Sequence, residues 1–390
     1  MISLAPHKLC SGCTACQAAC GRGALTMRED VDGFRYPLID PAICVECGAC
    51  VKICPVLNPA QTRLPMRCYA AKSKDDVLRQ QSSSGGVFTE LAVPVLKDGG
   101  CVYGCVMESG TFQVYHTKAE DTRGLAAMRK SKYVQSDLKD VFRDLRKEVE
   151  NGRRVLFSGT PCQISGLRSF LGKDYENLLL VGIVCHGAPS YKLMMRFIEC
   201  KQKKCASRFE TFDFRSKATG WKNFAIQCDD AQGTSQYVEG QMTNSYMGLF
   251  NGNVAFRESC YNCLSRAGRA PTDVLIGDFW GVESLCAEMD DQKGTSVILA
   301  YTERGEKALR GTGLDLREIS FDAATRFNRN VQASEKRPLL RSVIYPLLNW
   351  LPFDFVARLY RMMCLSEWEK AMYGIYRHVR PILVRLGMKQ

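Results

Sequence analysis

The sequence of 390 residues lacks three features that would place it in other classes of protein. No stretch approaches the roughly 18 uninterrupted apolar residues of a membrane-spanning helix. Residues 1–7 show neither the basic segment nor the apolar run of a secretory leader. No G-x-G-x-x-G follows a predicted strand, so a Rossmann-type dinucleotide site is not supported. We therefore expect a cytoplasmic protein whose twenty cysteines bind metal and do not form disulfides.

The first eight cysteines follow a repeated spacing. Residues 10–20 and 44–54 each contain C-x2-C-x2-C-x3-C, the spacing of bacterial ferredoxins that hold two 4Fe-4S clusters. In such ferredoxins the fourth cysteine of each run binds the cluster of the other run. The predicted ligands are Cys10, Cys13, Cys16 and Cys54 for a first cluster, and Cys44, Cys47, Cys50 and Cys20 for a second. A pair of zinc sites is the alternative, although zinc does not require a fourth cysteine at this offset.

Length and composition predict two to three domains with well-filled cores, since 46% of the residues are hydrophobic. After a proline-punctuated linker, predicted strands and helices alternate, which is typical of an α/β domain with some antiparallel sheet. The expected fold is therefore mixed, α+β with α/β. Its predicted parts are a ferredoxin-like dicluster domain over 1–64, two parts of an α/β domain over 66–152 and 153–335, and a helical tail over 336–390. The clearest predicted strands cover 67–71, 101–106, 112–116, 155–157, 178–184, 274–276 and 297–300.

Four further cysteines lie where predicted elements bring them together. Cys162 stands in the first turn of a helix that follows a strand, and Cys185 ends the next strand. A right-handed β-α-β unit would place both thiols at one edge of a parallel sheet. The helix N-terminus favours a thiolate at Cys162, and Cys260 and Cys263 add a C-x2-C pair. From spacing alone, the four are ligands of one cluster, or the first two are buried core cysteines.

Several short motifs resemble one known family. The motifs that carry this resemblance are G-T-P-C-Q at 159–163, the strand ending at Cys185, the cysteine pair at 260–263, and the following D-V and G-D at 273–278. In these motifs the chain resembles the beta subunits of coenzyme F420-reducing hydrogenases and dehydrogenases, a family that includes a plant chlorophyll-derivative reductase. The resemblance covers residues 69–313, with 66–152 as its N-terminal part and 153–335 as its C-terminal part. It implies that Cys162, Cys185, Cys260 and Cys263 bind a third 4Fe-4S cluster beside a flavin, which we expect to be FAD.

The expected flavin contacts are Ser84, Gly85, Gly86, Lys132, Tyr133 and Thr160. Residues 82–86 open a predicted helix, where free N–H groups would hold a phosphate; an ordinary helix cap is the alternative. Residues 130–136 resemble a second flavin-contacting segment, where a lysine would stabilise an anionic ring or phosphate; a solvated basic loop is the alternative. His186 is a candidate proton donor, although a lone histidine more often has a structural role.

The formal net charge of +12 raises the question of a nucleic-acid partner. Three clusters of about −2 each would cancel roughly half of it, so we expect none. Residues 337–390 hold nine Lys or Arg against three Asp or Glu, interleaved with apolar stretches. Such helices either lie on an anionic membrane surface, which would make the protein membrane-peripheral, or pack against the body of the protein.

The sequence thus predicts a flavin-dependent iron-sulfur oxidoreductase. A one-electron donor such as a ferredoxin would be its redox partner protein, and a small molecule, coenzyme F420 or another, would exchange a hydride. The alternative is a non-catalytic electron-transfer subunit of a larger hydrogenase or dehydrogenase complex.

Overall fold

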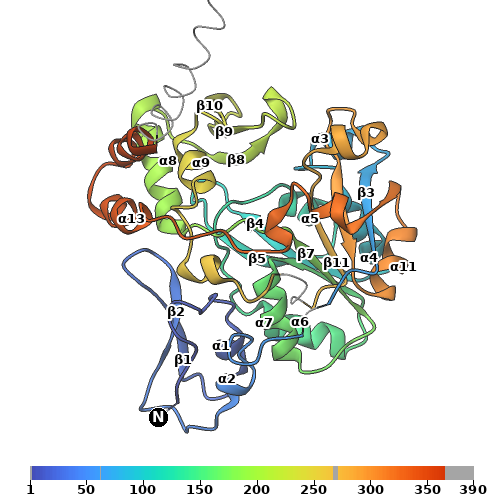
Figure 1. Cartoon of the computed structure of the whole chain (residues 1–390). Coiled ribbons are helices and arrows are strands. Elements are labelled where there is room, and N and C mark those ends of the chain that lie inside the picture. The colour runs from blue at the N-terminus through green and yellow to red at the C-terminus, as the bar shows by residue number, and fades with distance from the viewer. Residues whose placement is uncertain (1, 62, 267–270, 365–390) are drawn as a thin grey trace, which may run out of the picture.

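An eight-stranded mixed sheet forms the centre of the computed structural model, which describes residues 2–61, 63–266 and 271–364 (Figure 1). Four middle strands run parallel, and antiparallel strands flank them on both sides. The order across the sheet is β13 (Leu314–Ile319), β3 (Arg67–Ser73), β12 (Ser296–Ala300), β11 (Val274–Asp278), β7 (Leu178–Ile183), β6 (Val155–Gly159), β4 (Cys101–Met107) and β5 (Val114–Ala119).

Helices cover both faces of this sheet because alternate strand residues point to opposite sides. Leu156 belongs to the core under α4, α5 and α11, whereas Val155 and Phe157 belong to the core under α6 and α7. The helices are α3 (Asp76–Gln80), α4 (Val87–Lys97), α5 (Thr122–Met128), α6 (Val141–Glu150), α7 (Pro161–Leu171), α8 (Tyr191–Cys205), α9 (Ser245–Asn251), α10 (Val282–Leu285), α11 (Glu303–Arg310), α12 (Phe321–Thr325) and α13 (Arg341–Trp350).

The predicted mixed α/β fold is confirmed, and the predicted β-α-β unit is β6, α7 and β7, with parallel strands. A capping box between Thr160 and Gln163 starts α7, with Pro161 in the first turn. The strand predicted at 112–116 begins only at Val114, because Phe112 has a φ of 56° in the turn before it. Residues 66–152 and 153–335 contribute strands to one sheet, in which β3 lies between β12 and β13. A separate antiparallel sheet holds β8 (Thr211–Ser216), β9 (Ala225–Asp229) and β10 (Ser235–Gly240).

The ferredoxin module lies below the main sheet, in blue in Figure 1, and consists of α1 (Ala15–Ala19), α2 (Ala49–Lys52) and a hairpin of β1 (Leu25–Glu29) with β2 (Arg35–Ile39). Ala15 is fully buried in the core formed by α6 and α7. Arg143 of α6 donates to the carbonyl oxygens of Gln17 (3.1 Å) and Ala18 (2.9 Å) at the end of α1. The module is therefore packed onto the body of the protein.

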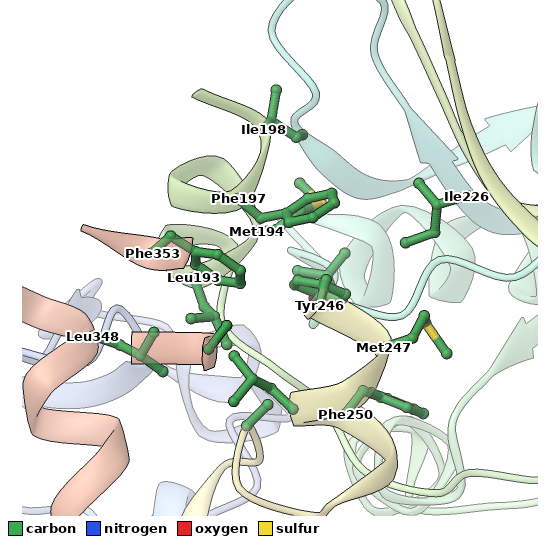
Figure 2. Close-up of a cluster of buried hydrophobic side chains, with 14 of the residues drawn as sticks. Leu193, Met194, Phe197, Ile198, Ile226, Tyr246, Met247, Phe250, Leu348 and Phe353 are labelled. Atoms are coloured by element: carbon green, nitrogen blue, oxygen red, sulfur yellow. The ribbon is translucent and has the colours of Figure 1, made fainter. Parts of the chain in front are cut away.

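The part of the predicted tail that the structure describes is packed into the core. Leu348 and Phe353 join Phe197 of α8 in one apolar cluster (Figure 2). The hairpin turn of the ferredoxin module also meets this region, since Phe34 stacks on Tyr345 at 6.1 Å and Asn349 donates to Asp32 at 2.8 Å. Of the two expectations for the tail, packing against the body holds for residues 341–357. Residues 365–390 lie outside the described residues.

Across the described parts of the chain, no helix has the length and apolar character that crossing a membrane requires.

Helix α13 has one buried face and one exposed face, and substitutions on the two faces should differ in their effect on stability. Leu348 is 1% exposed, so Leu348→Ala should lower the free energy of unfolding by about 2–5 kcal/mol, through lost burial and a cavity. Trp350, on the same helix, is 81% exposed, and Trp350→Ala should change stability by less than about 0.5 kcal/mol. Thermal or urea denaturation of both variants measures the difference. Equal, small effects would show that α13 does not contribute to the core.

Candidate functional site

The eight ferredoxin cysteines surround two cavities. One cavity, of about 500 Å³, is lined by Cys20, Cys44, Cys47 and Cys50, together with apolar residues of both strands of the hairpin. The other is lined by Cys10, Cys13, Cys16 and Cys54, and also by Cys50. The structure thus brings together each of the two predicted ligand sets, including the fourth cysteine that comes from the opposite run.

The sulfur spacing bears on which metal these residues hold. In the described residues, no three His, Cys, Asp or Glu side chains are close enough to bind a single metal ion. Tetrahedral zinc, with Zn–S bonds of about 2.3 Å, would hold its sulfur ligands about 3.8 Å apart. In a 4Fe-4S cluster each thiolate binds a different iron at a corner of the cube, so the sulfurs lie farther apart. In both cavities the fourth cysteine of one run lies with cysteines of the other run, which is the ligand pattern of ferredoxins that hold two 4Fe-4S clusters.

A third set of cysteines meets in the wall of a large cavity, whose volume is about 540 Å³. Cys162 comes from the first turn of α7, Cys185 follows β7, and Cys260 and Cys263 come from the loop before β11. Burial, together with the neighbouring Cys263 sulfur, raises the pKa of Cys260 to about 12. A strong local positive charge, such as the iron of a cluster supplies, would favour the thiolate form of Cys260.

Two buried arginines flank this third set. Arg257 is 1% exposed and Arg266 is 6% exposed, and both line the cavity. Arg266 donates to the carbonyl oxygens of His186 (2.7 Å) and Ala333 (2.6 Å), while its Nε is buried without a hydrogen-bond partner. Within the part of the chain that the structure describes, neither guanidinium pairs with a carboxylate. Uncompensated buried cations favour an anion beside them, as a cluster with four thiolates would be.

Helix α7 connects the third set to the ferredoxin module. Gly166 lies one turn after Cys162 on the same face of the helix. A Cβ placed on Gly166 would stand 2.8 Å from Cys13 Cβ and 2.9 Å from Cys13 Sγ. Glycine therefore allows a ligand of the first ferredoxin set to touch the helix that carries a ligand of the third.

The opposite wall of the large cavity is the start of α4. Its N-cap is Gly86, with a φ of 87°, and no side chain caps the helix. Its first N–H groups are thus available to an anion, and the helix dipole favours a negative group there. Apolar side chains complete the wall, namely Val87, Phe88, Met128, Met247, Ile276 and Trp280. The volume is within the range of about 300–1,000 Å³ for small-molecule sites.

Five of the six predicted flavin contacts line this cavity, and Gly85 is the exception. Gly85 instead packs under β3, where an added Cβ would lie 2.4 Å from the carbonyl oxygen of Ala71. The Ser84 hydroxyl is also occupied, since it donates to the Thr295 carbonyl at 2.8 Å. The helix N–H groups, and not the serine hydroxyls, are the free donors at this wall.

Lys132 is placed differently from the sequence expectation. Its ammonium lies within 3.0 Å of the Cys105 carbonyl oxygen and 2.7 Å of the Arg129 carbonyl oxygen, with those of Ala127 and Met128 both at 3.2 Å. Burial lowers the pKa of Lys132. Because main-chain carbonyls surround the ammonium, Lys132 acts in this structure as a cap for the last turn of α5.

His186 lies in the cavity wall between the third cysteine set and two phenylalanines. The side-chain oxygen Oδ1 of Asn330 accepts a hydrogen bond from Arg266 at 3.1 Å. The other end of the amide, Nδ2, therefore faces His186 and donates to His186 Nδ1 at 2.6 Å. His186 therefore carries its proton on Nε2, which is buried without a hydrogen-bond partner among the described residues. Burial lowers the pKa of His186. Its role as a proton donor stays a prediction.

Comparison with known proteins now identifies the family. Residues 68–143 match the model of the coenzyme F420 hydrogenase/dehydrogenase beta-subunit N-terminus, and residues 152–318 match that of its C-terminus. The chain belongs to this beta-subunit family. Residues 9–58 also match a 4Fe-4S dicluster domain, which supports iron-sulfur clusters in the ferredoxin module.

Two curated relatives match parts of the chain. The chain is 27% identical to a subunit of the F420H2 dehydrogenase of Methanosarcina mazei over 205 residues, which cover 48% of this chain and 56% of the relative. It is 30% identical to the coenzyme F420-dependent sulfite reductase of Methanocaldococcus jannaschii over 167 residues, 41% of this chain and 25% of that protein. The chain thus spans about half, and about a quarter, of the lengths of these relatives.

A chain of the F420-reducing NiFe hydrogenase complex of Methanosarcina barkeri aligns at a TM-score of 0.47 and 17% identity, over 69% of this chain and 89% of that one.

Sequence reasoning on this family member missed the buried polar groups of the cavity. Arg215, from β8, makes two 3.0 Å hydrogen bonds to Asp278 and one to the hydroxyl of Tyr133. His116 is 3% exposed and hydrogen bonds to Ser136 and the Ser158 carbonyl, each at 3.0 Å. Asp278 belongs to the quoted family motif, and Tyr133 and Ser136 belong to the predicted segment 130–136, whereas Arg215 and His116 carried no signal. Those two are brought to the cavity by strands that are distant in sequence.

The contact of α7 with Cys13 generates a second prediction. Gly166→Ala should displace Cys13, so we expect loss of iron from the first ferredoxin cluster and a destabilisation of about 1–3 kcal/mol from overpacking. Gly248→Ala is the matched control, because Gly248 is also helical and an added Cβ would meet nothing within 4 Å. That control should keep its iron and gain up to about 1 kcal/mol. Iron analysis and denaturation measure both variants. Full iron content in Gly166→Ala would contradict the close contact.

Proposed function

We propose that this chain is an iron-sulfur flavoprotein oxidoreductase that transfers electrons between a one-electron protein donor and a small organic hydride acceptor, coenzyme F420 or another molecule of that kind. One observation carries the proposal. Four half-buried cysteines converge in the wall of the same cavity that the uncapped start of α4 lines. One of them lies on α7, and Gly166 of that helix contacts Cys13 of the ferredoxin module.

The residues present suit a third 4Fe-4S cluster. Cys162, Cys185, Cys260 and Cys263 would hold it, and Arg257 and Arg266 would balance its negative charge. Thr160 Oγ1 donates to Gln163 Oε1 at 3.0 Å and lies 3.2 Å from Cys162 Sγ, so rotation of its hydroxyl would direct the proton to the ligand sulfur. Hydrogen bonds to ligand sulfurs are one of the means by which proteins set a cluster's reduction potential.

The residues present also suit a flavin, for which FAD is our expectation. The N–H groups at the start of α4 would bind its phosphate, and the apolar wall from Val87 to Trp280 would hold its ring. Bound there, a flavin supplies the conversion between one-electron and two-electron chemistry. The buried guanidinium of Arg215, which two hydrogen bonds to Asp278 hold in place, lines the same cavity and would be a hydrogen-bond donor to the flavin. His186 would contribute the proton on its Nε2.

A second candidate function is a non-catalytic electron-transfer subunit of a larger hydrogenase or dehydrogenase complex. The observation in its favour is the outer end of the ferredoxin module. Cys47, in the second ferredoxin set, is exposed. Its neighbours Ile43 and Val45 are exposed by 45% and 57%. Apolar side chains around an exposed cluster ligand are suited to contact with a partner protein. Turnover of a small molecule by the isolated chain would favour the enzyme over the subunit.

Anaerobic purification with iron and flavin analysis tests the cofactor content. Twelve assigned ligands imply about 12 iron atoms per chain, and we expect one extractable flavin. Cys162→Ala should lower the iron to about eight while the two ferredoxin clusters remain. Cys101→Ala is the control, since Cys101 is fully buried in the core under α6 and α7 and should alter stability alone.

Two results would overturn parts of the proposal. Iron near eight in the unmodified protein, or unchanged iron in Cys162→Ala, would remove the third cluster. Zinc in place of iron would remove the redox function.

A further inference from the structure

Arg257 joins the ferredoxin module to the loop that carries the third cysteine set. It precedes Cys260 by three residues, and its side chain reaches into the module. Its Nε donates to the Cys10 carbonyl at 2.7 Å, and its two terminal nitrogens donate to the Arg35 carbonyl (3.0 Å) and to Gln135 Oε1 (3.2 Å). Its guanidinium also stacks 3.9 Å from the centre of the Tyr36 ring.

This arrangement satisfies the N–H groups of Arg257 but not its charge. All three of its hydrogen-bond acceptors are neutral, and the neighbouring Glu258 pairs with Arg337 and Arg341 instead. A charge that is 1% exposed carries a large desolvation cost unless an opposite charge lies near it. In the described parts of the chain, no carboxylate supplies that charge.

Ligands of two predicted clusters lie around Arg257. Cys10, whose carbonyl it binds, belongs to the first ferredoxin set. On the other side, Arg257 lines the cavity together with Cys162, and its own carbonyl oxygen accepts from the Cys260 N–H at 2.9 Å. The two sets are adjacent, because Gly166 of α7 touches Cys13. The missing counter-charge is therefore available from two clusters of about −2 each.

We propose that Arg257 is a fixed positive charge shared by the first ferredoxin cluster and the third cluster, and that it raises the reduction potentials of both. This inference rests on the proposed function for its third cluster. Reduction adds an electron to a cluster, so a buried cation beside it stabilises the reduced form, and the low local dielectric strengthens that effect. One shared charge would shift both potentials in the same direction, so it would make both clusters easier to reduce and change the driving force between them little.

Arg266 provides the comparison within the same chain. It too is buried and without a carboxylate partner in the described residues, and it lines the same cavity as Cys185 and Cys260. Its hydrogen-bond partners are His186, Asn330 and Ala333, none of which belongs to the ferredoxin module. Arg266 should therefore act on the third cluster and not on the first.

The test is an EPR-monitored redox titration of the full, cluster-loaded chain, with Cys162→Ala used to assign the signal of the third cluster. In Arg257→Met, we expect the first and third clusters to be about tenfold harder to reduce, a shift of about 59 mV for a one-electron couple. The second cluster should keep its potential and serve as the internal reference. Arg257→Lys retains the charge, and its potentials should stay closer to those of the unmodified protein. Arg266→Met should shift the third cluster alone.

The outcomes separate this inference from the proposed function. If the chain holds only two clusters, the third-cluster assignment fails, yet Arg257→Met should still shift one of the two. Unchanged potentials in iron-replete Arg257→Met, or an equal shift in Arg257→Lys, would overturn the role of its charge.

If Arg257→Met does not retain its iron, Gln135→Glu replaces it, because this nearly isosteric change gives the guanidinium a carboxylate partner at the position of Gln135 Oε1. Lower potentials of the first and third clusters in that variant support the inference, and unchanged potentials overturn it.

Discussion

The contact between Gly166 and Cys13 is the constraint on which the arrangement of the three cysteine sets depends. Helix α7 begins at the edge of the main sheet with Cys162 in its first turn, and one turn later it meets the ferredoxin module. Any side chain at Gly166 would hold the module away from the helix. The close approach of the first and third cysteine sets thus comes from the absence of a side chain at one helical position, combined with a β-α-β unit that fixes where the helix starts.

Charge is the second organising feature. A formal net charge of +12 suggests a positively charged surface, but two of the arginines, Arg257 and Arg266, are buried. Both arginines occupy positions where a globular protein without anionic cofactors would incur a large desolvation cost. Part of the basic character of the chain is therefore internal. It lies beside thiols that would become anionic ligands, which is an argument for cofactors and against a nucleic-acid surface.

The fold and most of the predicted ligand positions followed from local sequence patterns, because ferredoxin spacing, strand-helix alternation and helix capping each depend on residues close together in the chain. Cys162 and Cys185 could be placed at one sheet edge since a single β-α-β unit joins them. Arg257, Arg215 and His116 could not be assigned in this way. Each acquires its role from partners more than 40 residues away, such as Ser158 for His116 and Cys10 for Arg257. Lys132 shows a case in which a sequence motif suggested one contact and the structure shows another. The motif predicted that its ammonium would contact an anion, whereas in the structure the ammonium contacts the carbonyl oxygens of Cys105 and Arg129.

The region after residue 336 shows how the module keeps its position. The module contacts the body at three separated places, namely α1 on α6 and α7, the side chain of Arg257, and the hairpin turn on α8 and α13. Contact at α1 alone would allow the module to rotate about that point. The stacking of Phe34 on Tyr345 and the bond from Asn349 to Asp32 oppose such rotation at the far end of the hairpin. Residues 341–357, whose basic and apolar sequence also suits a membrane surface, thus contact the hairpin turn of the ferredoxin module and pack into the core beside α8.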